Sequence, residues 1–263
     1  MYFGLSEEQQ FFKDNVNKFL HDHASLDVIK KIANSNNQKM NNEISSGILN
    51  LGINSLLVPE EQGGLGLDLL FATAVSQSLG ENVAPFSFAG SYVMAPVALS
   101  LGGSEDQKNI YLNSITKNEM KFAVGFAEYI AARNDFGFFF KNDTVTGKSI
   151  FVLDVENSTH LLIADEDGQI GVIDINDGNI KLTELTTVDK TRTYHEIQFD
   201  KVSVDILEQT KNSNQAVSKS IDAGRIVLAA DSLGASETLL KKAVEYSKAR
   251  KQFGRAIGSF QAV

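Results

Sequence analysis

Cationic side chains cluster around a Phe-Gly dipeptide near residue 250. Arg250 and Lys251 precede Phe253 and Gly254, and Arg255 follows them. A guanidinium is always charged and forms paired hydrogen bonds to phosphate oxygens, so this cluster has the chemistry to bind a phosphorylated ligand. A solvated basic helix end, favourable to the helix dipole, is the competing interpretation. Composition alone favours the second interpretation.

Several other chemistries are excluded by the sequence. The chain has no cysteine, which removes disulfides, thiolate metal sites and thiol nucleophiles. Its four histidines are scattered without metal-ligand spacing, so metal catalysis is not expected. No Gly-x-Ser-x-Gly elbow occurs, and no glycine-rich dinucleotide fingerprint follows a predicted strand. A net charge of −9 and a pI near 5.0 argue against a nucleic acid partner.

The composition is that of a globular protein of more than one domain, with 263 residues and 43% hydrophobic content. No apolar run approaches the ~20 residues of a membrane-spanning helix, and the first residues do not form a signal peptide, so we expect a cytoplasmic protein. The sequence ends within an apolar segment at 260–263, and no helix-ending signal follows that segment. We therefore expect that part of the functional apparatus is encoded beyond residue 263.

The first 115 residues predict helices. Ser6 and Gln9 have the spacing of a capping box, which starts a helix. The apolar residues of that helix recur at helical spacing and predict one buried face, made of Phe12, Val16, Phe19 and Leu20. Further helices are predicted over 40–52, 67–80, 90–101 and 104–115. The segment 58–66, with one proline and three glycines, is predicted to be a loop.

From about residue 121 the period changes from helical to alternating. Strands are predicted within 144–146, 149–152, 160–163, 170–173 and 196–199. The dipeptides Asp167-Gly168 and Asp177-Gly178 suit tight hairpin turns. Closely spaced strands without intervening helices predict an antiparallel barrel or sandwich.

A proline-free helical pattern occupies 214–249, long enough for a single helix of ~50 Å that packs along a bundle. Ala229-Ala230 and Gly234-Ala235 are small enough for a close helix crossing. The predicted fold class is α+β with several domains. They are a helical domain over 1–118, a β domain over 119–208 and the start of a helical bundle over 209–263.

Four ordered segments resemble one family, the acyl-CoA dehydrogenases. The segment LGINSLLVPEEQGGLGLD resembles the family's N-terminal signature, and SLGENVAPF with LGGSEDQKNIYLNSITKNE resembles the helices that follow. DKTRTYHEIQFDKVSV resembles the exit from its β domain, and RKQFGRAIGSFQAV resembles the opening of its C-terminal bundle. The resemblance covers nearly the whole chain.

The resemblance implies a helical domain, a central β domain and a C-terminal four-helix bundle, in agreement with the periods of the sequence. It implies FAD as cofactor, an acyl-CoA substrate and an electron-accepting flavoprotein as partner. It also implies a dimer or tetramer, in which the C-terminal domain of one subunit touches the flavin of another. Fatty acid or sterol side-chain catabolism is the implied setting.

The resemblance also assigns residues. Arg250, Lys251, Gln252 and Phe253 match an element that contacts the FAD of a neighbouring subunit, and Phe260 and Gln261 match a second FAD contact. Asp222 and Arg225 match positions along the acyl-CoA site. Arg225 is the expected substrate contact, with an ion pair to Asp222 as the competing interpretation.

The segment expected to cover the flavin ring departs from the family pattern. The stretch from Phe126 through Ala127 and Glu128 to Asn134 aligns with the family's Thr-Glu-Pro segment and the Gly-Ser-Asp after it. Ala127 stands in place of the threonine, so its hydroxyl is absent, and the proline and glycines are absent too. Phe151 and Leu153 stand where the family has Trp and Thr, which keeps an aromatic wall and loses a second hydroxyl.

No catalytic carboxylate is expected within the chain. Gly224 occupies the position from which a minority of the family supplies the base, and most members supply it from the C-terminal part. Glu128 matches a family glutamate without that role. We therefore expect residues 1–263 alone to be inactive.

The sequence supports two main functions. One is FAD-dependent α,β-dehydrogenation of an acyl-CoA, with a base from outside this chain. The alternative is a non-catalytic partner subunit of a heteromeric acyl-CoA dehydrogenase, which contributes to a composite FAD site. A protein of the same fold that serves only in binding or scaffolding is a third and minor hypothesis.

Overall fold

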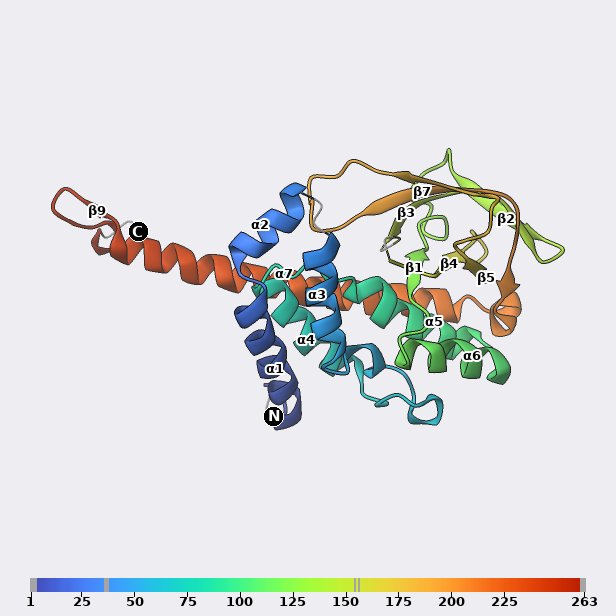
Figure 1. Ribbon diagram of the computed structural model, residues 1–263, viewed down its shortest axis with the longest axis horizontal. Helices are drawn as coiled ribbons and strands as arrows, with labels where there is room; N and C mark the ends of the chain where they lie inside the picture. The colour runs from blue at the N-terminus through green and yellow to red at the C-terminus, as the bar shows by residue number, and fades with distance from the viewer. Residues whose placement is uncertain (1–3, 36–37, 154, 156, 261–263) are drawn as a thin grey trace.

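The computed structural model describes residues 4–35, 38–153, 155 and 157–260, which form helices, then a sheet, then one long helix (Figure 1). The helices of the first part are α1 (Glu7–His23), α2 (Leu26–Ser35), α3 (Gln38–Leu49), α4 (Leu69–Glu81), α5 (Ala95–Gly102) and α6 (Glu105–Thr116). Shorter helical turns between them are η1 (Ile53–Ser55), η2 (Glu60–Gln62) and the π-helical η3 (Ala89–Met94).

The remaining elements follow in chain order. The strands are β1 (Phe122–Gly125), β2 (Gly137–Lys141), β3 (Thr144–Leu153), β4 (His160–Ala164), β5 (Ile170–Asp174), β6 (Ile180–Glu184), β7 (Tyr194–Ser203) and β8 (Asp205–Ile206). After them come η4 (Glu208–Asn212), α7 (Gln215–Ala249), β9 (Lys251–Gln252), β10 (Arg255–Ala256) and η5 (Ile257–Ser259).

The predicted capping box at the first helix is confirmed. The Ser6 hydroxyl accepts a hydrogen bond from the Gln9 backbone N–H, and the Ser6 N–H donates to the Gln9 side chain. Val16 and Leu20 are buried, and Phe12 and Phe19 pack against the same core. A second capping box, between Ser104 and Gln107, starts α6. Reciprocal bonds of this kind satisfy backbone donors that would otherwise lack partners at the helix start.

The central strands form one mixed sheet with hydrogen-bonded order β6-β7-β3-β1-β4-β5-β8, and β2 pairs with β3. The pair β1 and β4 is parallel, which departs from the antiparallel expectation, and the other pairings of the described strands are antiparallel. The predicted strands at 144–146 and 149–152 are one bulged strand, β3.

The two Asp-Gly dipeptides have different outcomes. Asp167-Gly168 joins the antiparallel neighbours β4 and β5, and Gly168 has a φ of 87°, as a tight turn of this kind requires. The predicted hairpin at Asp177-Gly178 is wrong, because β5 and β6 are not neighbours and β6 pairs instead with β7.

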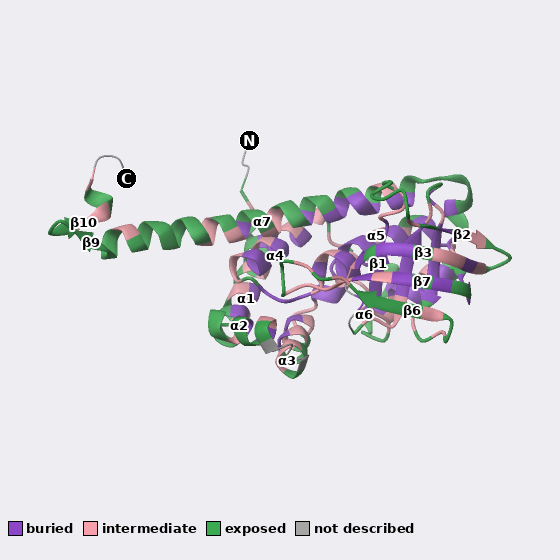
Figure 2. Cartoon of the chain, turned by 90° about the horizontal axis from the view of Figure 1, so that it is seen from above, coloured by how far each residue is buried: buried purple, intermediate pink, exposed green. Residues whose placement is uncertain are grey.

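Each face of the sheet covers a hydrophobic core. Phe122 and Val124 of β1 point into a large core shared with the helices, whereas Ala123 between them points into a smaller core between the strands. Leu161 and Leu162 of β4 divide in the same way. Since both faces of these strands are buried, the sheet curls around its own core and lies against the helices on its other face. Figure 2 shows this buried centre.

The first helical part and the sheet are joined by a half-buried polar contact. The Tyr111 hydroxyl of α6 donates a hydrogen bond of 2.5 Å to the Asp205 carboxylate of β8. The Gln107 side chain donates to the other oxygen of that carboxylate over 2.8 Å. Burial raises the pKa of Tyr111, and the bond to Asp205 raises it further. The hydroxyl therefore stays protonated as the donor.

Removing this hydroxyl is expected to destabilise the fold. A Tyr111→Phe substitution keeps the ring and leaves one carboxylate oxygen without its donor, which costs about 1.5–3 kcal/mol in the free energy of unfolding. Urea denaturation measures the change. Tyr246→Phe, on the exposed part of α7, is the matched control and should be neutral. Equal stability of both variants would show that the contact contributes nothing.

The helix α7 packs on α4 through two glycines. A Cβ built on Gly234 would lie 2.0 Å from the carbonyl oxygen of Gln77, and one built on Gly80 would lie 1.9 Å from that of Asp231. The prediction of a close helix crossing at Gly234 is thereby confirmed. Flanking bonds support the crossing, since Ser76 donates to the carbonyl of Val227 and Thr238 donates to that of Glu81.

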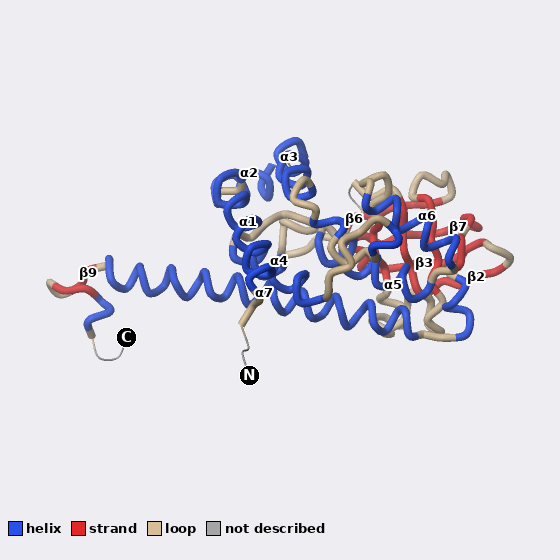
Figure 3. The backbone as a smooth tube through the Cα atoms, turned by 90° about the horizontal axis from the view of Figure 1, so that it is seen from below, coloured by secondary structure: helices blue, strands red, loops and turns tan. Residues whose placement is uncertain are grey.

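Beyond this crossing α7 extends away from the rest of the described chain (Figures 1 and 3). Its apolar residues there are exposed, namely Leu239, Leu240, Val244 and Tyr246. In the described residues, no helix is both long and apolar enough to cross a membrane. The division into domains at 118/119 and 208/209 stays a proposal. It is consistent with the change from α6 to β1 and with the position of η4.

Candidate functional site

An apolar cleft of about 310 Å³ lies where the sheet meets η3 and α7. Its lining comes from β1 and the loop after it, from the bulged part of β3, from η3 and from the first half of α7. Among the described lining residues, Arg225 is the only charged one, and Tyr194 contributes a phenol. A cleft of this size and polarity suits an aromatic ring or an alkyl chain.

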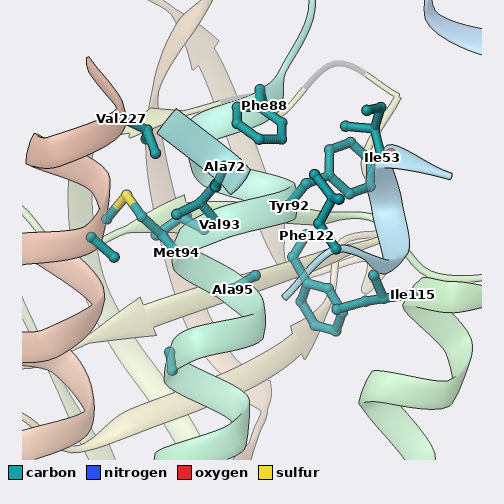
Figure 4. Packing of buried hydrophobic residues seen from close by; sticks show 14 of the residues in the cluster. Ile53, Ala72, Phe88, Tyr92, Val93, Met94, Ala95, Ile115, Phe122 and Val227 are labelled. Atoms are coloured by element: carbon teal, nitrogen blue, oxygen red, sulfur yellow. The ribbon is translucent and has the colours of Figure 1, made fainter. Parts of the chain in front are cut away.

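The π-helix η3 contributes Met94 to the cleft and is held in place by two hydrogen bonds from buried hydroxyls. The Ser91 hydroxyl donates to the carbonyl of Phe122 in β1, and the Ser220 hydroxyl of α7 donates to the carbonyl of Met94, each over 2.7 Å. The Met94 side chain is directed toward α7 (Figure 4), where the absence of a side chain at Gly224 makes room for it. π-helical turns of this kind often occur at functional sites.

Phe151 reaches the cleft because β3 is bulged. The register of β3 on β7 shifts between Ser149 and Val152. Within that bulge Phe151 has a φ of 56°, in the left-handed region that a bulky residue rarely adopts. A bulge redirects the side chain it contains, and Phe151 accordingly lines the cleft instead of the core of the sheet. Phe151 thus gives the cleft an aromatic surface, and its contact with a flavin stays a prediction.

The loop after β1 supplies four further lining residues. Phe126, Ala127, Ile130 and Ala132 line the cleft. The loop is closed by backbone bonds from Ala132 to Ala127 and from Ala131 to Glu128. Glu128 faces away from the cleft lining, and its carboxylate accepts hydrogen bonds from Ser149 and Ile150 of β3. Burial raises the pKa of this carboxyl. The hydrogen bonds that it accepts from the Ile150 N–H, from its own backbone N–H and from the Ser149 hydroxyl lower the pKa in part.

The ion pair predicted for Arg225 is confirmed, and its contact with a substrate stays a prediction. Arg225 lines the cleft, and its guanidinium also contacts the Asp222 carboxylate over 3.3 Å on the exposed face of α7. Asp222 itself is not among the lining residues. The pair is solvent-exposed and contributes little to stability, so the guanidinium can turn toward a ligand at small cost.

The predicted phosphate-binding cluster lies far from this cleft. Residues 250–256 form a two-stranded hairpin at the end of α7, roughly 38 Å along the helix from Arg225 at about 1.5 Å per residue. Phe253 is almost fully exposed, and Arg255 lies over the Phe260 ring at 4.0 Å. The structure thus brings Arg250, Lys251, Gln252, Phe253 and Phe260 together in this terminal segment. Gln261 lies outside the described residues.

Met94 and Tyr194 are among the lining residues that sequence reasoning does not assign to the site. Met94 reaches the cleft through contact with a helix more than a hundred residues later, and Tyr194 through the start of β7. The only local signal for Met94 is its place in an unbroken apolar segment, which is typical of core. In the described part of the chain, no group of three or more His, Cys, Asp or Glu side chains could hold a metal ion.

The three-part architecture is shared with solved flavoprotein structures. Butyryl-CoA dehydrogenase from Megasphaera elsdenii superposes on the whole chain and on 74% of its own length, with a TM-score of 0.83 and 22% identity. The glutaryl-coenzyme A dehydrogenase complex with glutaryl-CoA gives a TM-score of 0.82 at 21% identity, over 100% and 72% of the two chains. The FAD complex of PigA gives 0.82 at 20%, over 100% and 74%. These likenesses establish the fold.

Sequence comparison gives the family. The model of the acyl-CoA dehydrogenase N-terminal domain matches residues 6–119, and that of the C-terminal domain matches residues 214–263. Acyl-CoA dehydrogenase IpdE2 of Mycobacterium tuberculosis is 25% identical over 98% of this chain and 69% of its own. The short-chain specific acyl-CoA dehydrogenase of Megasphaera elsdenii is 27% identical over 100% and 74%. The chain belongs to the acyl-CoA dehydrogenase family.

Proposed function

We propose that this chain takes part in the FAD-dependent α,β-dehydrogenation of an acyl-CoA thioester. The observation that carries the proposal is the apolar cleft between the sheet and α7, with an aromatic wall on one side and Arg225 at its edge. FAD is the cofactor of the acyl-CoA dehydrogenase family, to which the chain belongs. When bound, it supplies the acceptor for the hydride that leaves the β-carbon.

The residues present fit a flavin ring. The loop from Phe126 to Ala132 and the bulge at Phe151 would hold the ring between them by surface contact, and the apolar lining would keep water away. The hydroxyls that the resemblance leads one to expect at Ala127 and Leu153 are absent. Polar recognition of the ring by this chain would therefore depend on backbone groups.

The substrate would enter beside α7. We propose that Arg225 contacts the acyl-CoA and that the far end of the acyl chain lies against Met94. The described lining contains no carboxylate, so the base for the α-proton has to come from outside it. In this proposal the lining of the cleft orients the thioester, and a segment outside that lining accepts the proton.

The absence of the hydroxyls expected at Ala127 and Leu153 favours the alternative, a non-catalytic partner subunit that completes the flavin site of a sister chain. The two functions differ in what retains the flavin. Retention of FAD by this protein alone, followed by oxidation of an acyl-CoA, supports the dehydrogenase. Retention only after mixing with a related companion chain supports the partner role. An unchanged apo-protein under both conditions contradicts both functions.

The terminal hairpin gives a sharper test of cofactor binding. We propose that Arg250 binds the FAD pyrophosphate of a neighbouring subunit. An Arg250→Gln variant is then expected to bind FAD roughly tenfold more weakly or worse, because charge-assisted hydrogen bonds to phosphate are lost.

Equilibrium titration with FAD, followed by quenching of flavin fluorescence, measures the effect. Lys242→Gln removes one positive charge from an exposed position on the same helix and should bind like the parent protein. Equal weakening in both variants would indicate a general charge effect. Unchanged affinity of the Arg250 variant would remove the hairpin from the site.

A further inference from the structure

The loop after β1 and the bulge of β3 are joined by one half-buried carboxylate, that of Glu128. Glu128 Oε1 accepts a hydrogen bond of 2.8 Å from the backbone N–H of Ile150, and Oε2 accepts one of 3.0 Å from the Ser149 hydroxyl. The two donors are adjacent in the chain, so the carboxylate holds the bulge by two neighbouring hydrogen bonds. This pair of hydrogen bonds is called the grip below. Ser149 is fully buried.

This grip lies one residue away from each wall of the cleft. Ala127 directly precedes Glu128 and lines the cleft, and Phe151 directly follows Ile150 and lines it as well. A change in the distance between Glu128 and Ile150 would therefore shift Ala127 and Phe151 relative to each other. No other side-chain hydrogen bond between the loop at 126–132 and β3 occurs among the described residues.

The bulge of β3 contains a backbone N–H that needs a hydrogen-bond acceptor from outside the regular ladder. The ladder between β3 and β7 is interrupted from Ser149 to Val152, so the Ile150 N–H lies where regular pairing is broken. The positive φ of Phe151 persists only if the surrounding contacts hold it. Glu128 supplies an acceptor inside the bulge, and burial strengthens such a bond.

We propose that Glu128 is a positioning residue that sets the shape of the cleft. Its carboxylate fixes Phe151 relative to Ala127, so that the cleft admits a flat ring. The proposal rests on the proposed function, because the ring that it positions is the flavin. Glu128 acts through its neighbours and takes no part in proton transfer.

Variants at this position separate the hydrogen bonds from the charge. Glu128→Ala removes both acceptors. Glu128→Gln keeps an oxygen for the Ile150 N–H and places its amide against the Ser149 hydroxyl, which can accept, so it should restore the grip. Ser149→Ala removes one of the two bonds and serves if the alanine variant at Glu128 does not fold. Glu166→Ala, an exposed glutamate outside the cleft lining, is the matched control.

Two measurements are made on each variant. Amide hydrogen exchange at residues 149–152 reports the grip without any cofactor. Titration with FAD, together with the shape of the visible flavin band, reports the cleft. Glu128→Ala is expected to speed exchange and to weaken FAD binding, each roughly tenfold or more, as expected for a lost hydrogen bond to a charged acceptor. Glu128→Gln and Glu166→Ala should behave like the parent protein.

The outcomes are distinct. Unchanged exchange in the alanine variant overturns the grip itself. Faster exchange with unchanged FAD affinity and band shape overturns the positioning role and leaves a purely structural contact. Failure of Glu128→Gln to restore binding would assign the effect to the charge and also overturn the proposal. If the parent protein binds no FAD, the proposed function fails, and the exchange measurement still decides whether the grip exists.

Discussion

A Gly234→Ala variant is expected to lose at least about 3 kcal/mol of unfolding free energy, at the upper end of what overpacking costs. The added methyl would lie 2.0 Å from the Gln77 carbonyl oxygen and 2.9 Å from the Glu81 nitrogen, both backbone atoms that no rotamer change can move. The helices α4 and α7 would have to separate, and the bonds from Ser76 and Thr238 across the crossing would stretch.

The expected loss of stability is opposite in sign to the usual effect of a glycine-to-alanine change in a helix. In an exposed helix a glycine-to-alanine change stabilises by up to about 1 kcal/mol. Thermal or urea denaturation distinguishes the two signs directly. Ala229→Ser, which adds one atom at an exposed position of the same helix, should be nearly neutral. A Gly234→Ala variant as stable as the parent protein would show that the crossing is looser than described.

A Met94→Ala variant is expected to change which acyl-CoA the protein prefers. Met94 is the last residue of η3, and its side chain lines the cleft beside Gly224 of α7, so its truncation removes three heavy atoms from the lining. Each methylene that a pocket gains is worth about 10- to 200-fold in discrimination. The ratio of kcat/KM for a longer thioester to that for a shorter one should therefore rise by at least about tenfold.

The rates are measured with a series of straight-chain acyl-CoA thioesters on FAD-loaded protein, in the presence of whatever chain completes the site. Met120→Ala, a partly buried methionine that is not among the cleft residues, controls for a general loss of packing. A parallel fall for all chain lengths in the Met94 variant would place the acyl chain elsewhere.

Local chemistry made part of this fold predictable from sequence. The spacing of Ser6 and Gln9 predicted the start of α1, and the absence of proline predicted the length of α7. In contrast, β1 was not predicted, because Phe122 to Gly125 is buried on both faces and shows no alternation. The edge strand β6 was not predicted either, because it is almost wholly exposed and only Ile180 packs against a core. The short helix α2 was missed beside a polar stretch at 34–37.

The site was predictable only in part, for a different reason. The resemblance singled out Phe126, Ala127, Phe151 and Arg225, which the structure brings to one cleft. Met94 comes to the same cleft through contacts that the sequence does not encode locally. The bulge that turns Phe151 into the cleft is equally hidden, because a phenylalanine gives no local signal for a positive φ.

Anaerobic addition of an acyl-CoA thioester to the FAD-loaded protein, with any chain that completes its site, tests the central claim most directly. The proposed function predicts that the visible absorption of the oxidised flavin bleaches and that the matching α,β-unsaturated thioester forms in equal amount. Tight FAD binding with no bleaching by short, long or branched thioesters, with or without a companion chain, would contradict it.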